Sequence, residues 1–132
     1  MDRNELNELC ARKKAQTIKL IEVADVTRQV AEAVDRGDSV SAQMLLNERE
    51  QPVRELGELD EGIRTYLEDC PEQDAFRLNE LLRGGEAETE DEKPLAEQVA
   101  QFRRLLGSVR AMDEQLSVRL GGGRSFYKKY NR

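Results

Sequence analysis

The chain has 132 residues, of which 21 are Lys or Arg and 27 are Asp or Glu, so its formal net charge is −6 at pH 7. It contains no histidine, which excludes histidine-dependent triads, general bases and metal sites. The acidic balance argues against nucleic acid as the main partner, and the lack of a run of about 18 apolar residues argues against membrane insertion. Charged residues make up 36% of the chain and apolar ones 38%, which favours long helices that meet along narrow seams.

The first predicted helix covers residues 2–36. Asp2 can cap its start, and apolar side chains then recur at steps of three and four residues. Lys13 and Lys14 interrupt this apolar stripe. Gly37 suits the left-handed position that ends a helix, and a turn this short makes the next helix fold back antiparallel to the first.

The second predicted helix covers residues 39–69, and its apolar residues follow the spacing of a coiled coil. Pro52 lacks a backbone donor, so we expect the helix to kink or restart near Arg49. The first two predicted helices also carry Arg, Lys and Glu side chains, from which a small helical enzyme could build a catalytic pocket. We interpret the following five as exposed helix positions instead: Arg12, Lys19, Arg28, Glu48 and Arg49.

Two further helices are expected. A short one over residues 71–83 begins at a proline and stops at two glycines. Residues 84–93 are rich in acids and hold no large apolar side chain, which predicts a solvated, mobile loop. The last helix is predicted over residues 94–120, where an apolar seam resumes.

The sequence therefore predicts an all-α fold, an antiparallel helical bundle of two or three long helices plus one short helix. Residues 1–120 form its single domain. Residues 121–132 form a flexible tail, because three successive glycines precede a basic and aromatic segment.

Few residues of the chain suggest a catalytic, metal-binding or phosphate-binding site. Cys10 and Cys70 do not form a CxxC pair, and we interpret them as separate reduced thiols. The acidic clusters fit solvated helix faces better than a cation site, and the glycines at 121–123 follow a helix, whereas a phosphate loop precedes one. We expect no catalytic residue, no metal ligand and no cofactor.

The tail is the most distinctive segment. From Arg124 to Arg132 it holds four basic residues, no acidic one and three of the six aromatic residues of the chain. Nine residues are a small footprint for RNA or an anionic membrane, and a plain solubility tail is the alternative. Aromatic and basic side chains also anchor short peptides on proteins. We favour a docking peptide with these residues: Phe126, Tyr127, Lys128, Lys129 and Tyr130.

Two stretches carry a family resemblance. Residues 45–60, LLNEREQPVRELGELD, are similar to a long-helix pattern of leucines, acids and arginine that leads to Leu-Asp, and residues 125–130 read SFYKKY. With the acidic helical architecture they resemble the bacterial flagellar export chaperones of the FlgN/FliT type. The resemblance implies a cytoplasmic protein that guards hook-associated (filament-junction or cap) subunits before type III export. It also implies that Tyr127 or Tyr130 contacts the export-gate protein.

The implied client is the amphipathic terminal helix of a secreted flagellar subunit, which could lie in an apolar groove. The candidate seam sets three residues of the second helix against three of the last: Leu56, Leu59, Ile63, Val99, Phe102 and Leu106. The alternative is that these side chains are ordinary core. The competing function is a generic helical adaptor or coiled-coil protein without an export role, and either protein could form a homodimer. The first ten residues have no signal-peptide core, so we expect cytoplasmic residence.

Overall fold

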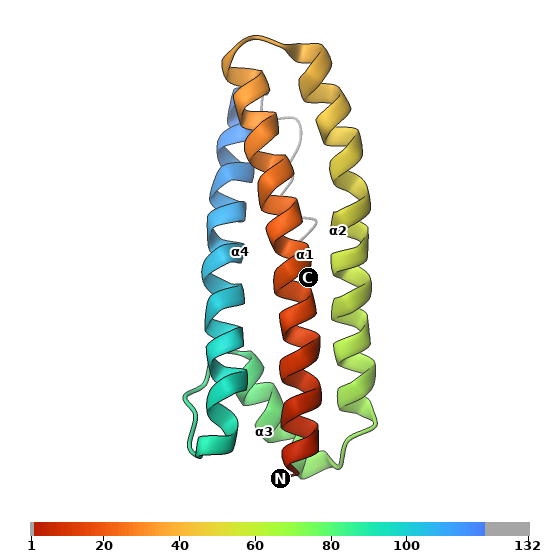
Figure 1. The fold of residues 1–132 in the computed structure, drawn as a ribbon, viewed down its shortest axis with the longest axis vertical. Coiled ribbons are helices and arrows are strands. Elements are labelled where there is room, and N and C mark those ends of the chain that lie inside the picture. Colours follow the sequence, from red (N-terminus) through yellow and green to blue (C-terminus); the bar gives the residue numbers. More distant parts are fainter. Residues whose placement is uncertain (1, 121–132) are drawn as a thin grey trace.

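The computed structural model describes residues 2–120, which contain four α-helices and no strand (Figure 1). This confirms the predicted all-α bundle. The helices begin and end close to the predicted positions: α1 Arg3–Asp35, α2 Ser39–Glu68, α3 Glu72–Leu82 and α4 Lys93–Arg119. None of these helices has a stretch long and apolar enough to cross a membrane.

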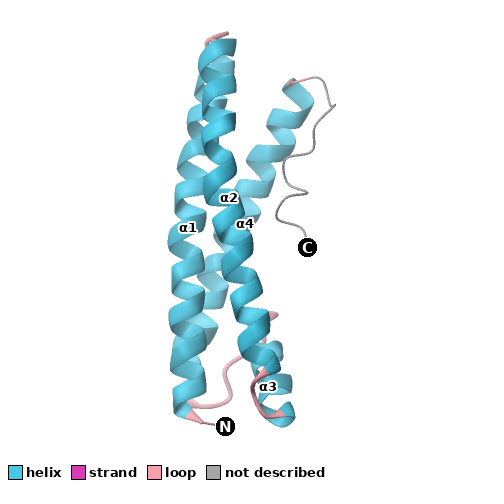
Figure 2. Cartoon of the chain, turned by 90° about the vertical axis from the view of Figure 1, so that its right-hand side faces the viewer, coloured by secondary structure: helices cyan, strands magenta, loops and turns pink. Residues whose placement is uncertain are grey.

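Helix α1 is the common partner of the other long helices. It packs against both α2 and α4, whereas α2 and α4 hardly approach each other. In Figure 1, α2 runs back antiparallel to α1, and α4 returns on the other side in the same direction as α1. Figure 2 shows that α4 leans away from α1 and α2 towards its C-terminal end, while α3 lies at the opposite end of the bundle. The backbones of α2 and α4 are thus each close to α1 but not to each other.

The helix ends follow from local side chains. Asp2 accepts a hydrogen bond from the Asn4 backbone N–H at 2.9 Å, and Asp38 accepts one from the Ser41 N–H at 3.0 Å. These carboxylates cap α1 and α2 by satisfying N–H groups that have no partner within the helix. Gly37 adopts a φ of 71°, which makes the turn between the two helices.

Helix α2 continues without a break through Pro52. Of the predicted kink or restart near Arg49, the restart does not occur. Proline removes one backbone hydrogen bond, and this loss is local. Every seventh residue of α2 remains buried on both sides of the proline, and this packing holds the helix together: Ala42, Arg49, Leu56 and Ile63.

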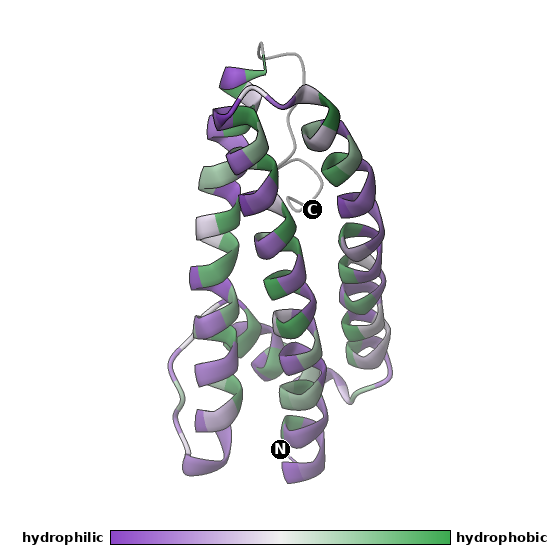
Figure 3. Ribbon diagram, turned by 45° about the horizontal axis from the view of Figure 1, so that its top comes forward, coloured by the Kyte–Doolittle hydropathy of each residue, from purple (hydrophilic) through white to green (hydrophobic). Residues whose placement is uncertain are grey.

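The core consists of three apolar clusters stacked along the bundle, and Figure 3 shows hydrophobic residues on the faces that the helices turn towards one another. The cluster near the N-terminus includes Leu9, Ile63 and Val99 together with Leu78 and Leu81 of α3. The other two clusters are smaller. The middle one is built around Leu20, Val23, Leu56, Phe102 and Val109, and the distal one around Val30 and Leu116.

Most residues of the segment between α3 and α4 are exposed, as the sequence predicts, but one acid of the run is buried. A short 3₁₀ turn, Glu90–Glu92, precedes α4, and only 4% of Glu92 is exposed. Its carboxylate accepts hydrogen bonds from Arg77 Nε at 3.0 Å and Nη2 at 2.5 Å, and from the Glu88 backbone N–H at 2.8 Å. The Arg77 guanidinium, the strongest influence, lowers the pKa of Glu92. One acid of the run therefore fastens the loop to α3.

Candidate functional site

The structure does not assemble the six predicted client-binding residues into one groove. Ile63 and Val99 belong to the first apolar cluster, where α3 covers them, and Leu56 and Phe102 belong to the middle one. All four are buried, and the most accessible of them, Phe102, is 8% exposed. They would touch a client only if neighbouring elements moved apart.

The other two predicted residues, Leu59 and Leu106, are half-buried and lie on different flanks. Leu106 packs against the middle cluster. Leu59 shares a face of α2 with Glu55 and Gly62. That face meets α1, because Lys19 Nζ lies 3.5 Å from Glu55 Oε2 and Arg12 Nη1 donates to the Gly62 carbonyl at 3.3 Å.

An apolar pocket that the sequence analysis missed lies at the turn between α1 and α2. Its volume is about 570 Å³. Four apolar side chains contribute to its wall, from the end of α1, the start of α2 and the end of α4: Val34, Ala42, Leu46 and Leu120. Residues 34–46 and the distant Leu120 form it together, so no single periodic pattern could reveal it.

The pocket combines a buried wall with an accessible mouth. Ala42 is only 6% exposed, whereas 43% of Leu120 is exposed. Val34 and Leu46 are half-buried and pack against the distal cluster. Asp38 and Gln43 form part of the polar rim, and the Asp38 carboxylate accepts a hydrogen bond from the Ser41 N–H. This arrangement can accept a large apolar side chain while leaving polar groups at the edge.

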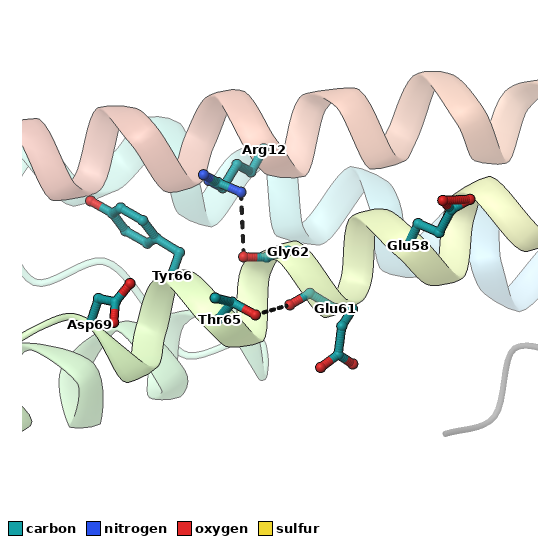
Figure 4. Close-up of a pocket in the computed structure, with 7 residues that line it drawn as sticks. All are labelled: Arg12, Glu58, Glu61, Gly62, Thr65, Tyr66 and Asp69. Atoms are coloured by element: carbon teal, nitrogen blue, oxygen red, sulfur yellow. Dashed lines mark hydrogen bonds between the residues drawn. The ribbon is translucent and has the colours of Figure 1, made fainter.

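A second, more open pocket of about 450 Å³ lies between α1 and α2 (Figure 4). Most of the residues that line it are polar or charged, among them Arg12, Glu58, Glu61 and Asp69. The Arg12 guanidinium carbon lies 5.1 Å from the centre of the Tyr66 ring. The Arg12 guanidinium is itself engaged, because its Nε donates to Glu8 Oε2 at 2.9 Å and its Nη1 donates to the Gly62 carbonyl at 3.3 Å. Within residues 2–120, no three His, Cys, Asp or Glu side chains come together as a metal site would require.

Arg49 is not the exposed side chain that the sequence analysis expected. It is 3% exposed, and its Nη2 lies 2.8 Å from both carboxylate oxygens of Asp113, which is fully buried. Its Nε donates to Thr27 Oγ1 at 2.8 Å. The signal was present in the sequence, since Arg49 lies at a seam position of α2. Nothing in the sequence indicated that its partners would be Thr27 on α1 and Asp113 on α4.

Lys13 is also buried, although we expected it to interrupt the stripe of α1. Its Nζ donates to Gln16 Oε1 at 2.9 Å and lies 3.7 Å from the centre of the Phe102 ring. Burial lowers the pKa of Lys13 to about 8, and the negative charge of Asp60 opposes that shift. Lys13 with Gln16 forms one polar layer between the apolar clusters, and Arg49 with Thr27 and Asp113 forms another. Neither Lys13 nor Arg49 lines the two pockets described above.

The five tail residues proposed to dock on an export gate, from Phe126 to Tyr130, lie outside the described residues. Cys10 and Cys70 are half-buried free thiols, and burial raises the pKa of each.

Comparison with protein-family models, with curated proteins and with solved structures finds no match for this chain.

Proposed function

We propose that the protein binds an amphipathic helix of a partner protein, and that it does so as an export chaperone for a secreted flagellar hook-associated subunit. The observation that carries this proposal is the apolar pocket at the turn between α1 and α2. Its volume of about 570 Å³ is within the range of specific binding pockets, roughly 300–1,000 Å³.

The chemistry of the pocket suits an apolar side chain presented by a helix. Amphipathic helices bind in apolar grooves through residues spaced at i, i+3, i+4 and i+7. Val34, Leu46 and Leu120 keep exposed surface that such a residue would remove from water. Binding there would also cover the apolar face through which a helix-forming subunit polymerises.

The export role adds the tail to this proposal. The resemblance of residues 45–60 and 125–130 to FlgN/FliT-type chaperones supports a flagellar client and a tyrosine-bearing docking segment. In this role Tyr127 or Tyr130 would anchor the export-gate protein, with Phe126, Lys128 and Lys129 beside them. Binding of the subunit would then be separable from docking, because the pocket and residues 124–132 are different parts of the chain.

A pair of matched substitutions tests the proposal. Leu46→Glu places a charge in the pocket, and Met44→Glu makes the same kind of change two residues away, on a side chain that is 58% exposed and does not line it. Each variant is co-expressed with hook-associated subunits from a flagellated bacterium, and its thermal melting is recorded. We expect Leu46→Glu to lose the subunit and Met44→Glu to retain it, with both variants folded.

Two other outcomes count against the proposal. If neither wild-type protein nor variant retains any hook-associated subunit, the export role is wrong and a generic adaptor becomes the better account. If Leu59→Glu releases the subunit while Leu46→Glu does not, the partner binds on the flank shared by α1 and α2 and the pocket is not the site.

A further inference from the structure

Helix α3 is held on the bundle by few contacts. It has only 11 residues, and its two fully buried side chains are Leu78 and Leu81. Phe76, its largest apolar residue, is 70% exposed. No side chain caps its start, and a helix of this length is marginal without tertiary support.

The surface beneath α3 is shaped for a helix. Leu78 and Leu81, three residues apart, enter the first apolar cluster, which α1, α2 and α4 complete with Leu9, Ile63 and Val99. A helix that presented two leucines at the same spacing would fill the same space. Ile63 and Val99 are two of the six residues that the sequence pointed to as a binding seam.

The connections of α3 allow it to move as a unit. Pro71 precedes it, and Gly84, with a φ of 98°, follows it. Apart from the two buried leucines and the half-buried Leu82, its main attachment is Arg77, which donates to Glu92 and, at 3.0 Å, to the Glu86 carbonyl. A single side chain, Arg77, therefore attaches α3 to the loop that leads into α4, through ion pairs with Glu88 and Glu92.

The first turn of α3 fits its surroundings poorly. The carboxyl group of Asp74 approaches that of Glu5 on α1, and burial together with Asp74 raises the pKa of Glu5. Glu5 Oε2 is buried and has no hydrogen-bond donor among the described residues. Two carboxyl groups face each other here and can be held together only by sharing a proton, whereas a cation in place of Asp74 would pair with the ionised Glu5 directly.

We propose that α3 is a displaceable occupant of a helix-binding site, and that the partner helix carries two leucines three positions apart and a lysine or arginine four positions before the first. The basic side chain would take the place of Asp74 and donate to Glu5. The inference rests on the proposed function only in assuming that the natural ligand is a protein helix. Its test needs no flagellar subunit.

Hydrogen exchange on the full chain tests whether α3 opens by itself. We expect the amides of residues 75–82 to exchange faster than those of α1, and Arg77→Met to accelerate them by about tenfold. Asp74→Lys should slow them. Glu72→Lys is the matched control, because it makes the same charge change on an exposed residue of the first turn and should have little effect. If α3 exchanges in step with α1 in all four proteins, it does not open separately and the proposal is wrong.

Synthetic peptides test the chemistry of the partner. Peptides of residues 71–83, with the native sequence, with Asp74→Lys or with Glu72→Lys, are titrated into the Arg77→Met protein, and exchange of its own α3 is followed. We expect the Asp74→Lys peptide to bind about fivefold more tightly than the other two and to accelerate exchange of α3. Equal binding of all three peptides, or no binding by any, would overturn the inference. Failure to retain a hook-associated subunit, with the peptide result intact, would overturn only the export role.

Discussion

Arg49 and Asp113 join α2 to α4 where the backbones of these helices hardly approach each other. Thr27 adds α1 to the same group by accepting a hydrogen bond from Arg49 and donating one to the Val23 carbonyl at 2.6 Å. A buried ion pair adds little net stability over apolar packing, but it is costly to leave half of it unpaired. We infer that this layer fixes the register of the three long helices.

This interpretation predicts an asymmetry between single and double variants. Arg49→Met or Asp113→Leu alone should lower the free energy of unfolding by about 3–5 kcal/mol, because each leaves one buried charge without its partner. The double variant should recover a large part of that loss. Urea denaturation of the wild type, the two single variants and the double variant measures these free energies of unfolding. If the loss in the double variant equals the sum of the two single losses, the pair is not coupled.

Lys13 gives a second prediction, which depends on pH. Its pKa is about 8 in the folded protein against 10.5 for an ordinary lysine. The unfolded chain therefore binds the proton more tightly, and the penalty for burying the charged amine is fully present below pH 8. As pH rises from 8 to 10.5, this penalty disappears and the contribution of Lys13 to stability becomes more favourable.

We therefore expect Lys13→Met to raise the free energy of unfolding relative to wild type by about 1–3 kcal/mol near pH 7, with the difference shrinking towards pH 10.5. Lys14→Met, at an exposed neighbouring position, is the control and should show no such trend. Chemical denaturation at several pH values measures the difference. A difference that does not change with pH would mean that Lys13 is not destabilised by burial.

At the scale of the helices, α2 and α4 each carry an exposed glycine in their interior, and no packing requires it. A methyl group on Gly57 or Gly107 would meet no atom within 4 Å outside its own helix. Replacing either glycine by alanine should therefore raise the free energy of unfolding by about 0.5–1 kcal/mol, because alanine loses less backbone entropy on folding.

Gly62→Ala is the comparison for this prediction. Its added methyl group would lie 3.3 Å from Arg12 Nη1, so that side chain would have to shift and the gain should be smaller. Thermal melting of the three variants ranks them. If Gly57→Ala and Gly107→Ala destabilise the protein, these glycines have a packing or conformational role that their surroundings do not reveal.

The helices were predictable because their signals are local. Asp2, Asp38 and Gly37 mark helix ends through their own backbone neighbours, and the apolar spacing gives the buried faces. The loop after α3 was not predictable in the same way, because Glu92 is buried by Arg77, 15 residues earlier. Sequence spacing likewise cannot show that Arg49 meets Asp113, 64 residues away.

At the scale of the whole molecule, the bundle formed by residues 2–120 is closed near the N-terminus of α1 and more open at the other end. Helix α3 completes the first apolar cluster, whereas the distal cluster has two buried residues among those that the structure describes and adjoins the apolar pocket. Polar layers at Lys13 and Arg49 hold the helices in register between these ends. The architecture therefore leaves apolar surface for a partner without requiring the centre of the bundle to open.

The most direct test of the central claim is hydrogen exchange of the full chain with and without a purified hook-associated subunit. A subunit helix bound in the pocket should slow exchange over residues 34–46 and at the C-terminal end of α4, and leave the centre of α1 unchanged. If the subunit forms no complex, or forms one that protects only surfaces away from the pocket, the assignment of this protein as a helix-binding export chaperone that uses the pocket is contradicted.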